Sequence, residues 1–163
     1  DCEHIVGELM KGFLSKRPLS EEQKTEMKAN CPEIEEKYLS LLQRAVPAIA
    51  LPSFTALNTA FCNDVEPELV FAQCLMGLGK KDDILLCIST SGNSKNVAAA
   101  ALTAKALGIK TIGLTGKTGG KLKSICDICI CVPETETFKV QELHLPVYHY
   151  LCARVEEEIF IGE

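Results

Sequence analysis

The 163-residue sequence lacks a long apolar run, an excess of basic residues and a recognisable export signal. No apolar run approaches the roughly 20 residues that a membrane-spanning helix requires, so we expect no membrane association. The formal net charge of −5 argues against nonspecific nucleic-acid binding, which needs a basic surface. An apolar content of 47% and a charged content of 24% are typical of a globular protein, and the length suits one domain.

The sequence also lacks the cysteine spacing of a structural zinc site, although it contains nine cysteines. Cys126, Cys129 and Cys131 lie in ICDICICVP, which has the character of a short buried strand with Cys129 and Cys131 on one face. No second CxxC pair completes a set of four ligands. We therefore favour buried free thiols over a metal or redox site and over disulfides. Free thiols without an export signal predict a cytoplasmic protein.

In the second half of the chain, apolar runs alternate with helical segments. The expected strands are 82–90, 110–116 and 127–133 (DDILLCIST, KTIGLTG and DICICVP). A helix from about Ser94 to Leu107, ended by Gly108, and a short helix over 119–126 connect them. This alternation predicts an α/β fold: a three-layer αβα sandwich with a central parallel sheet, flavodoxin-like or Rossmann-like.

The remaining segments predict a further strand and several helices. PAIALP (47–52) has the composition of a strand, 53–63 that of a helix or turn, and 65–79 that of a helix. Residues 137–160 are amphipathic at the helical period despite Pro146. The chain opens within an amphipathic helix, DCEHIVGELMKGFL, and residues 16–43 are highly charged and predict one or two solvated helices.

The segment ISTSGNSKNV (88–97) places hydroxyls around a glycine, between an expected strand and an expected helix: Ser89, Thr90, Ser91 and Ser94. Ligands of open parallel sheets sit outside the carboxyl ends of the strands. Unpaired N–H groups at a helix start favour an anion, and hydroxyls add hydrogen bonds. A single serine would be enough to cap the helix, so the loop predicts a phosphate site, with an ordinary capping loop as the alternative.

The three histidines allow either a functional site or simple packing. His4 and Glu8 are four residues apart on the first expected helix and share a face. Gln141 and His149 are eight residues apart, about 80° around an ideal helix, and can share a face too. Two such pairs could form a mixed nitrogen and oxygen metal site or an acid–base pair. Surface or packed histidines are the alternative, and we expect a packing role for His144.

Three motifs together carry a family resemblance: ISTSGNS, LTGKTGGK and the QE-x-H-x4-H helix. From Asp1 to about Phe160 the chain is similar to the sugar isomerase (SIS) domain, and within it to the phosphoheptose isomerase branch. The resemblance implies a single SIS domain over 1–163. It also implies that the loop hydroxyls hold the phosphate of a sugar: Ser89, Thr90, Ser91 and Ser94.

The same resemblance implies a zinc site and a proton-transfer pair, with no nucleotide cofactor. DCEHIVGEL matches the family's His-x3-Glu helix, and QELHLPVYH matches its Gln-x7-His. Zinc would be held by His4, Glu8, Gln141 and His149. Glu8 would be the general base and His149 the general acid. Gln141 would also bind substrate, together with Asp64, which matches an acidic residue of the family's active site.

The implied reaction is ketose–aldose isomerisation of a phosphosugar, namely sedoheptulose 7-phosphate to a heptose 7-phosphate. A carboxylate removes a proton from the carbon beside the carbonyl to give an enediol, and an acid returns a proton to the neighbouring carbon. A divalent ion would polarise the carbonyl oxygen. Family members resemble tetramers whose sites draw on adjacent subunits, so we expect a homo-oligomer, a tetramer or a dimer.

Departures from the family pattern leave two other functions open. The family's N-terminal helix, first strand and first phosphate loop are missing, and we expect them to precede Asp1. Gly12 replaces the arginine that follows the His-x3-Glu helix, and Phe138 replaces an aspartate. Residues 16–43 form an expected helical insertion. The alternatives are a noncatalytic phosphosugar-binding sensor or regulator, and a protein-interaction module.

Overall fold

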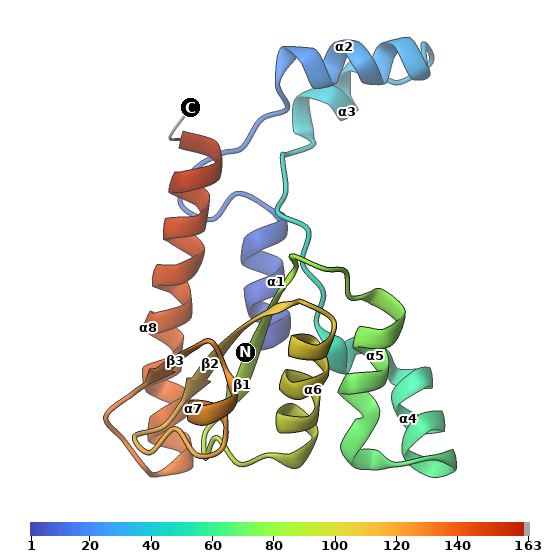
Figure 1. Ribbon diagram of the computed structural model, residues 1–163. Coiled ribbons are helices and arrows are strands. Elements are labelled where there is room, and N and C mark those ends of the chain that lie inside the picture. The colour runs from blue at the N-terminus through green and yellow to red at the C-terminus, as the bar shows by residue number, and fades with distance from the viewer. Residues whose placement is uncertain (162–163) are drawn as a thin grey trace. The chain divides into compact units, whose positions relative to one another are not determined.

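The computed structural model describes residues 1–161, which divide into two compact units (Figure 1). The first unit contains Asp1 and Ala50–Val147, and the second contains Cys2–Ile49 and the chain from Tyr148 onward. Within the described residues, no helix is long and apolar enough to cross a membrane.

A parallel sheet forms the centre of the first unit. In the described part of the chain its strands are β1 (Ile84–Ser89), β2 (Lys110–Thr115) and β3 (Ile128–Cys131), in the order β1-β2-β3 (Figure 1). Ile84 pairs with Lys110, and Ile112 pairs with Ile128. Helix α6 (Lys95–Ala106) connects β1 to β2, and the short helix α7 (Leu122–Ile125) connects β2 to β3. The predicted α/β fold with a parallel sheet is confirmed.

Alanines let α6 pack closely against the sheet and its neighbours. Ala100 and Ala104 form one buried cluster with Leu75 and Ile109, and Ala101 lies in a second cluster. Alanine also has the highest helix propensity, so the same residues favour the helix and its close packing. Gly108 follows the helix with φ of 75°, as expected for the glycine that ends it. The core therefore fixes the start of α6, where the hydroxyl loop lies.

Further helices of the first unit are α4 (Thr55–Asp64), the 3₁₀ turn η2 (Pro67–Leu69) and α5 (Val70–Leu78). The predicted strand over 47–52 is wrong: Leu51–Ser53 form a 3₁₀ turn, η1, and the residues before it have no regular structure. A strand needs a ladder of hydrogen bonds, and Pro47 and Pro52 have no N–H to donate. The composition of residues 47–52 resembles that of a strand, but none of the strands of the described sheet pairs with this segment.

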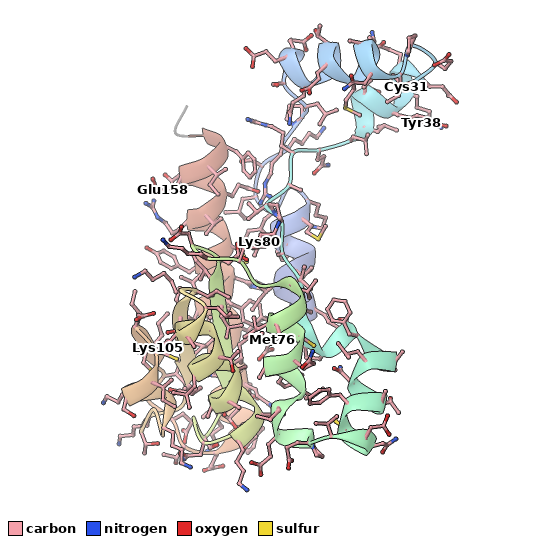
Figure 2. The ribbon with its side chains drawn as sticks, turned by 45° about the vertical axis from the view of Figure 1, so that its right-hand side comes forward. Cys31, Tyr38, Met76, Lys80, Lys105 and Glu158 are labelled. Atoms are coloured by element: carbon pink, nitrogen blue, oxygen red, sulfur yellow. The ribbon has the colours of Figure 1, made fainter. Side chains whose placement is uncertain are left out.

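The second unit is helical. It contains α1 (Cys2–Met10), α2 (Glu21–Asn30), α3 (Glu36–Leu41), the last part of α8 (Thr137–Glu156) and the π-helical turn η3 (Glu157–Ile161). A capping box between Ser20 and Gln23 starts α2. Figure 2 shows Cys31 and Tyr38 in the segment that carries α2 and α3, and both residues are exposed. Residues 16–43 are therefore mainly helical.

One charged residue of that segment is buried, contrary to the expectation of a solvated surface. Arg17 has 0% exposure and lies against Glu156, which is 1% exposed, with an Nη2–Oε2 distance of 2.6 Å. The Glu156 carboxylate also accepts hydrogen bonds from the backbone N–H groups of Phe13, Leu14 and Ser15. Burial alone would raise the pKa of Glu156, but these bonds and Arg17 outweigh it and hold the pKa below its usual value.

All nine cysteines are free in this structure, although only three of them are buried. Cys74, Cys87 and Cys152 are buried, and burial raises the pKa of each of these thiols. The Sγ atoms of Cys129 and Cys131 are 3.8 Å apart, so the two thiols share a face of β3 as predicted. The raised pKa values of Cys74, Cys87 and Cys152 make these three thiols poor nucleophiles.

Candidate functional site

The hydroxyl loop runs from the carboxyl end of β1 to the start of α6, where an open parallel sheet places ligands. The hydroxyls of Ser89 and Ser94 are hydrogen-bonded to each other, with their Oγ atoms 2.9 Å apart. Ser94 is the N-cap residue of α6, but its side chain does not cap the helix. An ordinary capping loop would use that hydroxyl on the helix, so simple capping by Ser94 does not account for the loop, and the phosphate site stays a prediction.

The remaining hydroxyl residues shape the turn. The Ser91 hydroxyl accepts a hydrogen bond from the Asn93 backbone N–H at 3.1 Å, and the Thr90 carbonyl accepts one from the Gly116 N–H at 2.9 Å. Gly92 has a φ of 66°, in the left-handed region that favours glycine. Its backbone N–H donates to the Ser89 carbonyl at 3.0 Å. The loop is thus fixed mainly by its own backbone.

A second loop, LTGKTGGK, supports the first. The Leu122 N–H donates to the Gly92 carbonyl at 3.1 Å, and the Lys121 N–H donates to the Asn93 side-chain oxygen at 3.1 Å. Gly119 and Gly120 approach Gly92 so closely that a Cβ on Gly92 would collide with the Gly119 carbonyl. The glycines of this motif therefore permit close contact of two backbones.

The substitution Gly92→Ala is expected to lower the free energy of unfolding by about 1–3 kcal/mol, because it adds both backbone strain and a collision. The matched control is Gly77→Ala in α5, where a Cβ meets nothing within 4 Å. That change should stabilise the protein by about 0.5–1 kcal/mol, since alanine favours a helix more than glycine does. Urea denaturation measures both. Equal effects of the two substitutions would contradict the close approach at Gly92.

An open hollow of about 300 Å³ lies at the start of α6, lined by Pro67, Glu68, Lys95 and Asn96. Lys95 follows Ser94 directly, and its ammonium forms an ion pair with Glu68 at 2.5 Å. The Glu68 carboxylate raises the pKa of Lys95. The structure thus places a cation at the end of the hydroxyl loop.

The other predicted residues of the first unit are accessible to a ligand. Asp64 is exposed at the last position of α4, and η2, which follows it, packs against α6. Gln141 is exposed on α8, as is Phe138, which is 57% exposed near the start of that helix. His144 is fully buried, and burial lowers its pKa, in agreement with a packing role. These positions leave the predicted roles of Asp64 and Gln141 as predictions.

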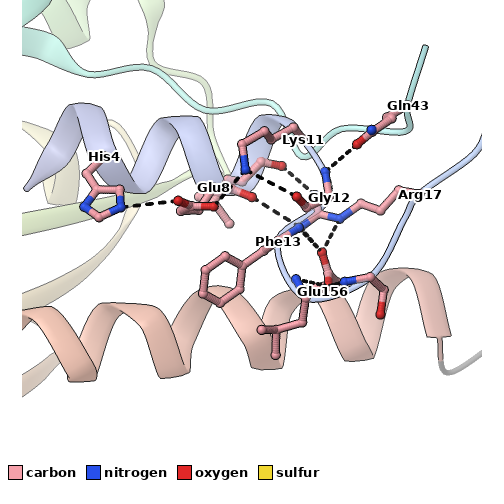
Figure 3. Close-up of polar contacts among 11 residues, drawn as sticks. His4, Glu8, Lys11, Gly12, Phe13, Arg17, Gln43 and Glu156 are labelled. Carbon is pink, nitrogen blue, oxygen red and sulfur yellow. Dashed lines mark hydrogen bonds and ion pairs between the residues drawn. The ribbon is translucent and has the colours of Figure 1, made fainter. Parts of the chain in front are cut away.

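In the second unit, side chains from opposite ends of the polypeptide lie close together, and Figure 3 shows the contacts of Glu8 with His4 and Lys11. His4 Nε2 lies 3.2 Å from Glu8 Oε1, and Lys11 Nζ lies 3.2 Å from Glu8 Oε2. The His4 and His149 rings are 5.1 Å apart between centroids and nearly perpendicular. The His149 Nε2 atom is buried and makes no hydrogen bond within the described residues. His4 therefore lies beside both Glu8 and His149, a grouping that the family resemblance implied and that spacing alone had left as two separate pairs.

A tyrosine completes the cluster and was not predicted from the sequence. The hydroxyl of Tyr148 lies 3.0 Å from His4 Nδ1, and Tyr148 is 2% exposed. Burial raises the pKa of the Tyr148 phenol, so it stays protonated near neutral pH. Its only sequence signal is its position directly before His149.

The donor chemistry of the cluster suits zinc, which is held by imidazole nitrogen and carboxylate oxygen at about 2.0–2.2 Å. Ligands at that range in tetrahedral geometry lie about 3.3 Å apart. The 3.2 Å separation of His4 Nε2 and Glu8 Oε1 fits this spacing, and the buried Nε2 of His149 offers a third nitrogen or oxygen donor of the required kind. Across residues 1–161, no three side chains of His, Cys, Asp or Glu already converge as a metal site.

Gly12, which stands where an arginine was expected, is required by a tight turn after α1. A Cβ there would collide with the Ser15 carbonyl, and the Gly12 N–H donates to the Gln43 side chain at 2.6 Å. Positive charge reaches the end of α1 from Arg17, whose Nη1 donates to the Leu9 carbonyl at 2.7 Å, and from Lys11 beside Glu8. The expected arginine is thus absent, but Arg17 and Lys11 place positive charge at the same end of α1.

Comparison with known proteins gives the family. A family model described as SIS domain matches residues 53–153, more than half of the chain. The chain belongs to the SIS domain family. The phosphoheptose isomerase of Aneurinibacillus thermoaerophilus is 38% identical over 160 residues, which cover 98% of this chain and 68% of that protein. The chain is thus a SIS-domain protein of the phosphoheptose isomerase branch.

Other SIS-domain relatives agree in sequence and in fold. The phosphoheptose isomerase of a Nitratiruptor species is 49% identical over 115 residues, 71% of this chain. The chain spans 62% of the length of that relative. The structure of a phosphoheptose isomerase from Francisella tularensis superposes with a TM-score of 0.72 at 32% identity, covering 93% of this chain and 67% of that one. The predicted SIS fold is confirmed.

Proposed function

We propose that the protein is a phosphosugar isomerase that interconverts sedoheptulose 7-phosphate and a heptose 7-phosphate. The observation that carries the proposal is the cluster of Glu8, His4 and His149, a carboxylate and two imidazoles from opposite ends of the chain. The hydroxyl loop at the start of α6 supports a phosphate-bearing substrate. Relatives named phosphoheptose isomerases support the choice of sugar.

In the proposed reaction, Glu8 takes a proton from the hydroxymethyl carbon beside the ketose carbonyl. His149 gives a proton to the carbonyl oxygen, and the product is an enediol. His149 then takes the proton of the neighbouring hydroxyl, and Glu8 returns its proton to the former carbonyl carbon. The result is an aldose, and both side chains regain their starting protonation. Ser89, Thr90, Ser91 and Ser94 would bind the phosphate during these steps, and Asp64 and Gln141 would bind the sugar.

We further propose that the site holds zinc through His4, Glu8, His149 and Gln141. When bound, zinc would polarise the carbonyl oxygen of the substrate. The close spacing of His4 Nε2 and Glu8 Oε1 and the unpartnered Nε2 of His149 support this assignment.

The test is an assay of the purified full-length protein with sedoheptulose 7-phosphate, with and without added zinc. We expect turnover to an aldose phosphate, loss of activity on treatment with a chelator, and recovery with zinc. Elemental analysis should find one zinc per chain. Absence of turnover under every metal condition would reject the isomerase proposal, and turnover without any bound metal would reject the zinc assignment.

We also propose that the protein works in the cytoplasm as a homotetramer or a homodimer. Nine free cysteines support a reducing compartment. The amphipathic sequence of α8 and its exposed apolar residues, such as Leu145, support packing between copies. Light scattering of the full-length protein measures the mass, and a monomer would contradict the oligomer.

A noncatalytic phosphosugar-binding regulator is the second candidate. Two features support it: Gly12 and Phe138 replace polar residues of the family pattern, and no described trio of His, Cys, Asp or Glu forms a ready metal site. This function predicts a thermal shift with phosphosugars but no isomerisation. The turnover assay therefore separates the two candidates.

A further inference from the structure

Tyr148 contacts the cluster through a single polar atom. Its hydroxyl is 3.0 Å from His4 Nδ1, and its ring is buried and edge-on to both histidines. The centroid of the Tyr148 ring lies 5.5 Å from that of His4 and 5.0 Å from that of His149. A phenylalanine would fill the same space, so the hydroxyl is the distinctive part of this residue.

The hydrogen bond occupies one nitrogen of His4 and leaves the other for Glu8. A neutral imidazole carries a proton on one nitrogen and accepts a hydrogen bond at the other. Without a metal, the Nε2–H of His4 can donate to Glu8 Oε1, 3.2 Å away, while Nδ1 accepts from the Tyr148 hydroxyl. With a cation on Nε2, the proton must move to Nδ1, which then donates to the Tyr148 oxygen.

A phenol can serve in both arrangements because it both donates and accepts hydrogen bonds. A carboxylate or a backbone carbonyl in its place could only accept, and would hold His4 in one tautomer. We propose that Tyr148 is a positioning residue that fixes the orientation of the His4 ring and keeps Nε2 directed at Glu8 in both states. The part of this inference that concerns the metal-loaded state rests on the proposed function.

The test compares the full-length wild type with Tyr148→Phe by ¹⁵N NMR of the histidine side chains. Spectra are recorded without metal at about pH 8.5, where ordinary imidazoles are neutral. We expect Nδ1 of His4 to give the ¹⁵N shift of a hydrogen-bonded nitrogen in the wild type and that of a nitrogen without this bond in the variant. The control is Tyr150→Phe on the same helix, where the tyrosine is 65% exposed. It should leave the His4 signals unchanged.

A second readout is zinc affinity, measured by competition with a chromophoric chelator. Loss of a hydrogen-bond partner behind a metal-binding histidine costs about 10–100-fold in affinity, and we expect a loss in that range for Tyr148→Phe. The thermal midpoint should change little, because the ring and its packing remain. Both readouts are independent of turnover.

An unchanged His4 Nδ1 signal in Tyr148→Phe overturns the inference, whatever the protein does with zinc or with sugars. A shifted Nδ1 signal supports it even in a protein that proves to have no isomerase activity. Failure of the inference and failure of the proposed function are therefore distinguishable.

Discussion

The substitution Glu156→Ala is expected to lower the free energy of unfolding by about 3–5 kcal/mol, the usual cost of removing one partner from a buried ion pair. Glu156 is 1% exposed and receives five hydrogen bonds or ion-pair contacts, from three backbone N–H groups and two nitrogens of Arg17. Without the carboxylate, Arg17 would be a buried charge with no counter-ion. The three N–H groups would also lose their acceptor.

Urea denaturation of the full-length protein measures this effect. The control is Glu21→Gln in α2. Glu21 is exposed, and the loss of its ion pair with Lys24 should leave the urea midpoint unchanged. If Glu156→Ala does not fold, Glu156→Gln keeps the shape and still removes the charge. A loss below about 1 kcal/mol in either variant would contradict the structural role of the pair.

The same residue should produce a distinct pH dependence. The pKa of Glu156 is lowered in the folded protein, so its stabilising contribution is present above the ordinary glutamate pKa of about 4.3. It is lost as the pH falls through the lower folded value. Wild-type stability should therefore fall more steeply below about pH 4 than that of Glu156→Gln. Parallel curves for the two proteins would show that the carboxylate is not charged in the fold.

The Arg17–Glu156 pair also bears on the site. The Arg17 guanidinium donates to the carbonyls of Glu8 and Leu9 at the end of α1, groups that a helix leaves without internal partners. A cation there also interacts favourably with the helix dipole. The pair thus fixes the turn of α1 that carries Glu8 to the helix that carries His149.

Much of the fold could be predicted from local pattern. The three strands of the described sheet, the alanine-rich helix after the first and its terminal glycine follow from hydrophobic runs and helix-end signals. The prediction of a strand over 47–52 was wrong because a strand requires a partner strand, and composition does not specify one. Local rules succeeded where the determining interactions are close in sequence.

The site was predictable where residue types and spacing suggest chemistry. His4 and Glu8 share a helix face, and the resemblance paired them with His149. Arg17 and Glu156 are 139 positions apart, and each stands in a charge run that suggests a solvated surface. The local sequence does not indicate which of the three glutamates at positions 156–158 is buried. Tyr148 was missed for the same reason: its role depends on a contact with a residue 144 positions away.

The substitution Glu8→Gln is expected to reduce turnover of sedoheptulose 7-phosphate by about 100- to 10,000-fold, the usual contribution of a general base. Glutamine has nearly the same shape, and its single side-chain oxygen can still accept a hydrogen bond from either His4 or Lys11, which contact the two oxygens of Glu8 at 3.2 Å. It cannot take a proton from carbon. The loss should therefore fall on kcat, while phosphosugar binding at the loop changes by no more than about twofold.

Steady-state kinetics measures the change in kcat, and a binding measurement with the same phosphosugar measures the change in affinity. Exchange of substrate hydrogen with deuterated solvent follows the proton transfer itself, and should stop in Glu8→Gln. The control is Glu22→Gln, an exposed glutamate of α2, which should retain wild-type rates. Retention of more than about a tenth of the turnover in Glu8→Gln would remove Glu8 from the chemistry.

The pattern across the two measurements also decides between the candidate functions. An isomerase loses turnover and solvent exchange in Glu8→Gln but keeps its affinity for the phosphosugar, because the loop proposed to bind the phosphate is separate in sequence from the proposed base. A regulator that only binds the sugar has no exchange to lose, even in the wild type. Wild-type solvent exchange into the substrate therefore separates the isomerase from the regulator, and its loss in Glu8→Gln assigns Glu8 to catalysis.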